Sequence, residues 1–367
     1  MFTITVNDIE RIFQDYGIYE HCAGFSELQR YHYEEDDPDS KEVRLIVKAE
    51  INSGSAVVIR FKNEADVTLD TVTAQSKFAV LLAENGIETP RIYHANGQYA
   101  RWYQISGYKV IVTVEDFVGG ELKEVDTKTA EQTGRLLARM HNVSEMNDFH
   151  VQNDVLFHPL KRNDLFSFED FAVHKEYLKS VHADLYHKIV LGYSHLLEKV
   201  RFFENEPQYA VQGDISDCNL YRNAYGTIGV FDFNRCGDNV LYYDAVMQAV
   251  FEARLMVYPK EIAKAPEAVI LPAFLKGYHQ ERPFTDRQIE VFPYLYALIS
   301  AFWLFDMRWS EHSLANAIEQ ADADAALNWM KEICNRMAYR FRRLCLIYLL
   351  SSFQRRYASI SDLKPAR

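Results

Sequence analysis

The chain has 367 residues, 48% of them hydrophobic, and carries a formal net charge of −12. A chain of this length exceeds the usual size of a single core, so we expect two lobes, and its acidic balance argues against nucleic acid or an anionic membrane as a main partner. No apolar run approaches the ~20 residues that a membrane span needs. Five cysteines without a C-x-x-C pair, and no signal-peptide pattern after Met1, predict a reducing, cytoplasmic setting.

The first third of the chain has the pattern of a small antiparallel sheet with one helix. Strands are predicted at residues 43–51 and 55–62, and Asn52-Ser53-Gly54 between them is a turn signal. Apolar residues then recur at helical spacing through residues 69–85. A buried strand is predicted from residue 108 onward and runs into the glycine pair at residues 119–120.

The middle of the chain contains three side chains at a spacing that suits phosphoryl transfer. Asn219 lies five positions after Asp214, and Asp232 lies thirteen positions after Asn219. A carboxylate in a short loop can accept the proton of an attacking hydroxyl, while an amide oxygen and a second carboxylate can hold Mg²⁺ against nucleotide phosphates. Short strands predicted at residues 209–211 and 228–231, with a turn at 223–226 between them, are expected to bring these side chains to one rim.

With Gln212-Gly213-Asp214 and the later Asp232-Phe233-Asn234, the chain resembles the aminoglycoside phosphotransferase and choline kinase family, whose usual motifs are close to H-G-D-x-x-x-x-N and D-F-D. The resemblance implies a two-lobed, protein-kinase-like α+β fold, with a small N-terminal antiparallel-sheet lobe over residues 1–117 and a larger, mostly helical C-lobe over residues 118–367. It also implies transfer of a phosphoryl group from ATP or GTP, with Mg²⁺, to a hydroxyl of a small molecule. Asp214 would then be the base, and Asn219 and Asp232 the metal ligands.

The same resemblance suggests which residues of the first lobe contact the nucleotide. In the family a basic residue on the strand before the helix faces the phosphates, and Arg60 is preferred for this role, with Lys62 on the same strand face as the competing candidate. Gln75 stands where the family commonly has a glutamate that pairs with the basic residue. Glu115 and Phe117 lie in the segment that leads to the hinge, where the family holds adenine by backbone hydrogen bonds.

Three departures from the family pattern leave an alternative open. Gln212 replaces a usual histidine and Gln75 a usual glutamate. The expected phosphate-covering loop, residues 34–42, has six acidic residues and no glycine, so it is expected either to swing outward as a solvated tip, which we favour, or to weaken nucleotide binding. The alternative is a non-catalytic nucleotide- or metabolite-binding protein with a kinase-like fold.

The rest of the chain is predicted to be mostly helical and to hold the acceptor. Helical patterns cover residues 126–141, 185–203, 242–256, 268–280, 286–309, 314–335 and 337–357. Together with the net charge, acidic residues in these helices predict an acceptor that is cationic or carries an amine. Asp306 and Glu311 are preferred as pocket carboxylates over Glu252 and Asp244, although ordinary surface charge is the competing interpretation.

Two further residues near these motifs are interpreted as structural. His141 lies at the end of the first helix of the second lobe, where a lone histidine is more often a packing residue than a catalyst. Cys218 lies inside the catalytic loop and is predicted to be a small buried residue rather than an oxidation-sensitive one.

Overall fold

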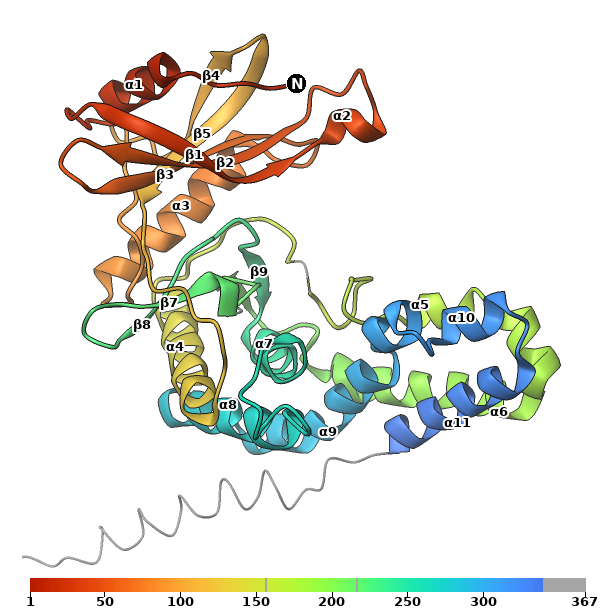
Figure 1. The fold of residues 1–367 in the computed structure, drawn as a ribbon. Coiled ribbons are helices and arrows are strands. Elements are labelled where there is room, and N and C mark those ends of the chain that lie inside the picture. Colours follow the sequence, from red (N-terminus) through yellow and green to blue (C-terminus); the bar gives the residue numbers. More distant parts are fainter. Residues whose placement is uncertain (156, 216, 339–367) are drawn as a thin grey trace, which may run out of the picture. The chain divides into compact units, whose positions relative to one another are not determined.

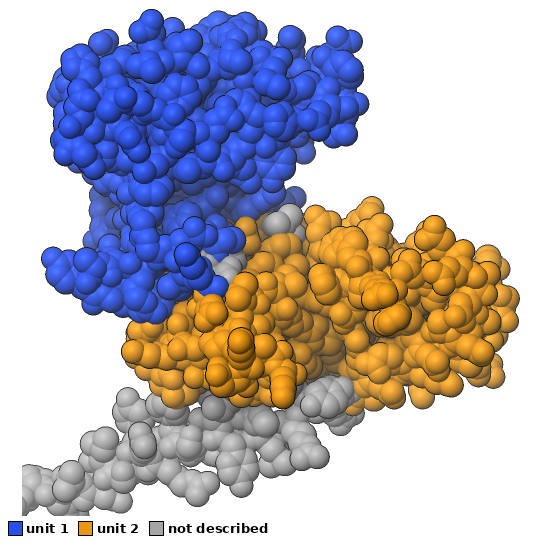
Figure 2. Space-filling view, viewed as in Figure 1, with its two compact units in different colours: residues 1–123, 142–154, 217–238 blue, residues 124–141, 155–216, 239–367 orange. Residues whose placement is uncertain are grey.

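The computed structural model describes residues 1–155, 157–215 and 217–338 (Figure 1), and the chain divides into two compact units. Unit 1 consists of Met1–Lys123, Asn142–Asp154 and Asp217–Asp238, and unit 2 of the remaining segments (Figure 2). The division into lobes after residue 117 stays a prediction. Contacts group the chain differently from such a single cut, because two later segments pack with the N-terminal sheet.

The elements follow one another in an order that changes from mostly strands to mostly helices. They are α1 (Val6–Asp15), β1 (Cys22–Tyr31), α2 (Tyr33–Asp36), β2 (Val43–Ile51), β3 (Ala56–Asn63), α3 (Leu69–Glu84), β4 (Arg101–Ile105), β5 (Tyr108–Asp116), α4 (Thr127–Met146), α5 (Phe168–Ala172), α6 (Lys175–Val200), η1 (Arg201–Phe203), β6 (Gln208–Val211), η2 (Asp217–Asn219), β7 (Leu220–Arg222), β8 (Ile228–Val230), β9 (Gly237–Val240), α7 (Leu241–Leu255), α8 (Glu267–Glu281), α9 (Asp286–Ala301), the π-helical turn η3 (Phe305–Trp309), α10 (Leu314–Glu319) and α11 (Ala323–Ala338).

Unit 1 is built on an antiparallel sheet with the strand order β1-β2-β3-β5-β4. Side chains alternate between the two faces of a strand, so β3 sends Val57, Ile59 and Phe61 into one core with α1. The residues between them, Arg60 and Lys62, therefore lie on the opposite face, where α3 packs. The predicted hairpin, helix and antiparallel-sheet lobe are confirmed.

A second, smaller hairpin in unit 1 joins β7 to β8. The turn at residues 223–226 lies between these two strands, while β6 pairs with β9 instead. The predicted strands at residues 209–211 and 228–231 and the turn at 223–226 are present, but a further strand, β7, which was not predicted, lies between β6 and that turn. Strand β7 has three residues, which is too short for its alternation to be recognised in the sequence.

Unit 2 is dominated by helices, as predicted, but two of the expected helices are interrupted. The helix predicted at residues 286–309 ends at Ala301 and is followed by η3. The one predicted at 314–335 is split into α10 and α11 at Ala321, whose positive φ of 53° cannot continue a right-handed helix. The helix predicted at 337–357 lies almost entirely outside the described residues.

Helices α4 and α8 pack with their backbones in direct contact. A Cβ atom at Gly277 would lie 1.9 Å from the carbonyl oxygen of Glu131, and one at Gly134 would lie 2.0 Å from that of Phe274. Glycine is therefore required on both helices at this crossing. In the described part of the chain, no helix combines the length and apolar character needed to cross a membrane.

Candidate active site

The loop that carries Asp214 belongs to unit 2 and is ordered by two glutamine side chains. It leaves β6 through Gly213, whose φ of 78° suits glycine. The backbone N–H of Asp214 donates to Gln212 Oε1 at 2.8 Å, and that of Ile215 donates to Gln248 Oε1 at 3.1 Å. Gln212 is fully buried. The glutamine that replaces the family's histidine thus still supplies a hydrogen bond to the loop.

A chain of buried polar side chains continues from Gln248 into the helices of unit 2. Gln248 Nε2 donates to Asp244 Oδ1 at 3.3 Å, and the other oxygen of Asp244 lies 3.0 Å from His141 Nε2. The second ring nitrogen of His141 lies 2.8 Å from the hydroxyl of Tyr278. Each polar group here has a partner, as burial requires. His141 therefore has the packing role expected of it.

The same burial removes two carboxylates from consideration as pocket residues. Asp244 is 1% exposed and Glu252 is fully buried. Cys218, in contrast, is exposed, so the prediction that it is a small buried residue is wrong. It lies in the short 3₁₀ turn η2, which leaves its side chain at the surface.

The two predicted metal ligands lie in unit 1, at the same end of the small hairpin. Leu220 pairs with Val230 in the β7–β8 ladder, so Asn219 just before β7 and Asp232 just after β8 are neighbours. The N–H of Phe231 donates to the carbonyl oxygen of Asn219 at 3.0 Å. Asp232 has a φ of 56°, a left-handed conformation that is uncommon for a residue other than glycine and often marks functional sites.

Arg60 on β3 connects Asp232 to the adjacent strand β5. Its guanidinium donates to Glu115 at 2.8 Å and to Asp232 at 3.4 Å. Burial works against the charged form of Arg60, but the two carboxylates keep its pKa above the ordinary value. Burial would likewise raise the pKa of Asp232, yet Arg60 and Lys62 outweigh it and hold that pKa below its usual range. The Asp232 carboxylate is therefore ionised at neutral pH.

Lys62 and Gln75 both hold the segment that follows Asp232. Lys62 donates to the side-chain oxygen of Asn234, and Gln75 Nε2 donates to the carbonyl oxygens of Asn234 at 2.9 Å and Cys236 at 3.3 Å. Burial, reinforced by Arg60, lowers the pKa of Lys62 to about 8. The glutamine at the family's glutamate position thus binds backbone here, while Arg60 has Glu115 as its carboxylate partner.

These nucleotide-binding candidates are largely gathered in one place. Arg60, Lys62, Gln75 and Glu115 all line a small cavity of about 20 Å³ in unit 1. Phe117 is not part of this lining. The residue is 39% exposed, Lys48 lies over its ring, and its N–H donates to the carbonyl oxygen of Ala56 at 2.9 Å. That N–H is therefore already engaged in the sheet.

The acidic segment between β1 and β2 begins with the short helix α2. Tyr33 anchors this helix through a 2.6 Å hydrogen bond to Glu64. Four of the six acidic side chains, those of Glu35, Asp36, Asp37 and Asp39, are exposed. This exposure agrees with a solvated tip.

The two predicted acceptor carboxylates differ in their surroundings. Asp306, in η3, pairs with Arg336 at 2.8 Å and lines a large cavity of unit 2. Glu311 is exposed and lies outside the lining of that cavity as the described residues form it.

The Asn219 and Asp232 pair fits a hard divalent cation such as Mg²⁺, which prefers oxygen ligands and keeps some of its coordination for phosphates and water. Within the described ranges, no group of three or more His, Cys, Asp or Glu side chains is placed to hold a metal ion. A cation at this pair would therefore complete its coordination with phosphate oxygens and water.

The fold and this arrangement of side chains define a protein of the kinase-like small-molecule phosphotransferase class. A family model described as the phosphotransferase enzyme family matches residues 44–286, and the chain belongs to this family. A comparison with curated proteins gives no match.

Among solved structures, the chain is similar to a microcompartment-associated aminopropanol kinase, with 15% identity, coverage of 94% of this chain and 98% of the other, and a TM-score of 0.55. It is also similar to an amicoumacin kinase in complex with AMP-PNP, Ca²⁺ and Ami, with 16% identity, coverage of 90% and 93%, and a TM-score of 0.51. At these identities the likeness concerns the fold.

Proposed function

We propose that the chain transfers the γ-phosphoryl group of ATP or GTP to a hydroxyl of a small, amine-bearing molecule. The observation that carries this proposal is the hairpin that sets Asn219 beside Asp232, with Asp232 kept ionised by Arg60. Family membership and the nucleotide analogue named for the amicoumacin kinase support it. The amine-bearing acceptor is further supported by the name of the aminopropanol kinase and by the net charge of −12.

In the proposed reaction, Asp214 accepts the proton of the acceptor hydroxyl as its oxygen bonds to the γ-phosphorus, and the bond from that phosphorus to the β,γ-bridging oxygen breaks. Asn219 and Asp232 would hold Mg²⁺, which when bound neutralises charge on the phosphate oxygens. Arg60 or Lys62 would face the phosphates, and the segment of Glu115 and Phe117 would hold the purine ring of the nucleotide. Of the two acceptor carboxylates predicted from the sequence, Asp306 is the one we propose, because Glu311 lies outside the lining of the cavity that Asp306 borders.

The alternative is a non-catalytic nucleotide- or metabolite-binding protein, motivated by the acidic loop at residues 34–42 and by Gln75 and Gln212. Both side chains make ordering hydrogen bonds, Gln212 to the catalytic loop and Gln75 to the segment after Asp232. The departures from the family pattern therefore leave the local structure supported, which favours the enzyme.

The test is a screen of purified protein with γ-labelled ATP and GTP against amino alcohols, amino sugars, choline, homoserine, thiamine and macrolides. We expect labelled product with at least one amine-bearing acceptor, and none when Mg²⁺ is chelated. Calorimetry that detects no nucleotide binding at millimolar concentration with Mg²⁺ would contradict the kinase proposal and favour a non-catalytic, metabolite-binding role.

A further inference from the structure

Unit 2 contains a cavity of about 800 Å³ whose lining includes none of the residues Asp214, Asn219 and Asp232. It is formed by the end of α7, the start of α8, the C-terminal part of α9, η3 and the end of α11. Small-molecule sites commonly have volumes of ~300–1,000 Å³ and combine apolar walls with a few oriented polar groups. This cavity has both kinds of wall.

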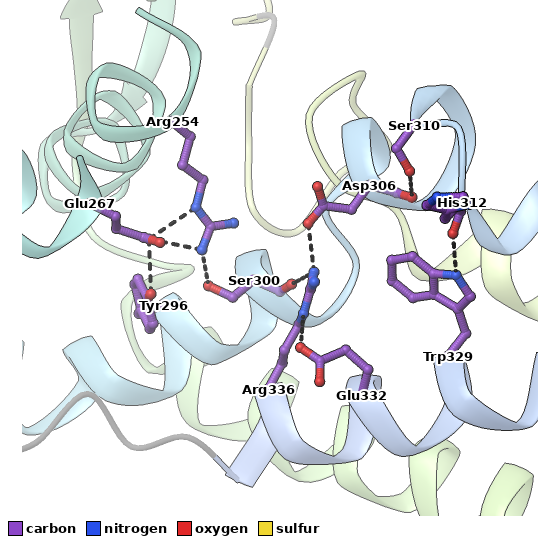
Figure 3. A network of polar contacts seen from close by, with 10 residues as sticks. All are labelled: Arg254, Glu267, Tyr296, Ser300, Asp306, Ser310, His312, Trp329, Glu332 and Arg336. Atoms are coloured by element: carbon purple, nitrogen blue, oxygen red, sulfur yellow. Dashed lines mark hydrogen bonds and ion pairs between the residues drawn. The ribbon is translucent and has the colours of Figure 1, made fainter. Parts of the chain in front are cut away.

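On one side of the cavity, Arg254 is fixed by three neighbours. Its Nε donates to Glu267 at 2.9 Å and its Nη2 to Ser300 Oγ at 2.8 Å. The guanidinium also lies over the Trp303 ring, 4.9 Å from the ring centre. Its third nitrogen, Nη1, points away from Glu267 and makes none of the hydrogen bonds found among the described residues (Figure 3). A positioned donor is therefore presented to the cavity.

On the other side, Arg336 holds two carboxylates. It donates to Asp306 Oδ2 and to Glu332 Oε1, both at 2.8 Å, and more weakly to the carbonyl oxygen of Ser300 at 3.3 Å (Figure 3). Within the described part of the chain, Oδ1 of Asp306 has no hydrogen bond of its own. Ser300 thus joins the two networks, through its hydroxyl to Arg254 and its carbonyl to Arg336.

The charges of the two networks do not cancel. Three carboxylates, those of Glu267, Asp306 and Glu332, face two guanidinium groups. The surplus of one negative charge favours a cationic ligand, and the open oxygen of Asp306 gives an ammonium group an acceptor. Phe305, 49% exposed, adds an apolar surface to the same lining.

Helix α7 connects the cavity to the catalytic loop within unit 2. Gln248 holds the N–H next to Asp214, and Arg254 follows six residues later on the same helix. At 1.5 Å per residue, the two side chains are anchored about 9 Å apart along the helix axis.

We propose that this cavity binds the amine-bearing end of a hydroxylated acceptor, with Asp306 accepting from the ammonium group and Arg254 donating to a hydroxyl oxygen. This inference rests on the proposed function, because the ligand is a phosphoryl acceptor only if the chain is a kinase. Binding of the ligand to the cavity can nevertheless be tested without phosphoryl transfer. It adds Arg254 and the Arg336 network to the two carboxylates considered from the sequence, and it excludes Glu311.

The direct test is calorimetric titration of the full chain, without nucleotide, with glucosamine and 1-amino-2-propanol as probes and with glucose and 1,2-propanediol as their amine-free counterparts. We expect binding of at least one amine and at least tenfold weaker binding of its counterpart. Asp306→Asn should weaken amine binding at least tenfold, and Ala268→Trp, which fills the cavity without removing a charge, should abolish it. Glu319→Gln removes an exposed carboxylate outside the cavity and should bind like wild type. Thermal unfolding checks that each variant is folded.

Equal affinity for amine and counterpart, no binding of either amine at millimolar concentration, or wild-type affinity in both Asp306→Asn and Ala268→Trp would overturn the inference. If the chain phosphorylates an acceptor whose KM is the same in these two variants, the cavity assignment fails while the kinase proposal stands. If amines bind through Asp306 but no phosphoryl transfer is found with any nucleotide, the cavity stands and the kinase proposal fails.

Discussion

The sharpest structural prediction concerns the carboxylate partner of Arg60. In the structure this partner is Glu115, and not Gln75, which stands at the family's glutamate position. Arg60 and Glu115 have side chains that are 8% and 13% exposed and share hydrogen bonds of 2.8 and 3.2 Å. Each hydrogen bond to a charged group contributes about 1.5–3 kcal/mol to the stability of the folded state. A double-mutant cycle of Arg60→Met and Glu115→Gln should therefore give a coupling energy of about 2 kcal/mol.

The matched control is the cycle of Arg60→Met with Gln75→Ala. Gln75 donates to backbone carbonyls and not to Arg60, so its coupling to Arg60 should stay below about 0.5 kcal/mol. Native-state hydrogen exchange of the β3 and β5 amides is the suitable assay, because it reports the local stability of the sheet even if the two units unfold separately. A coupling to Gln75 as large as that to Glu115 would refute the assignment.

Three further predictions follow from the site and the packing. Asp232→Asn should weaken nucleotide binding at least tenfold in Mg²⁺ but little in EDTA, because a hard cation prefers a carboxylate; equal loss in both, by calorimetry, would argue against a metal role. The pKa of Lys62, lowered to about 8, means that the native state releases this proton before the unfolded state does, so stability rises between pH 8 and about 10.5. The free energy of urea unfolding of the wild type, measured relative to that of Lys62→Met, should therefore increase by up to about 3 kcal/mol from pH 7.5 to 10. Measured relative to Lys77→Met, which changes an exposed lysine, it should show no such increase. Gly277→Ala should destabilise by about 2 kcal/mol or more, since its Cβ meets a backbone oxygen, while Gly24→Ala, with open space around it, should cost less; similar thermal shifts for both would contradict the packing argument.

Local patterns were sufficient to predict the β2–β3 hairpin and α3, the elements that carry Arg60, Lys62 and Gln75. The β2–β3 hairpin has a turn signal between β-branched runs, and α3 is preceded by the N-cap residue Thr68, whose side chain accepts a hydrogen bond from the N–H of Thr71. Helix α1 was not predicted, although Thr5 and Asp8 form a capping box that announces its start.

Contacts between residues far apart in the sequence could not be predicted from local spacing. Arg60 pairs with Thr113 across β3 and β5, which places Glu115 two residues further along the same face, but only the register of the strands reveals this. Likewise, Gln248 reaches Ile215 from a helix that starts more than twenty residues after the loop, so no local spacing marks it as a positioning residue. The cavity at Asp306 depends on Arg254 and Arg336, which are far apart in the chain.

The most direct test of the account is turnover of Asp214→Ala, with Asp214→Asn as its isosteric companion. The backbone N–H groups of Asp214 and Ile215 make two hydrogen bonds that order this loop, and both changes leave these two bonds in place. Loss of a general base acts on the transition state, so both variants should transfer phosphate at least ~10²-fold more slowly while binding nucleotide with wild-type affinity. Wild-type turnover in either correctly folded variant would contradict the assignment of Asp214 as the base.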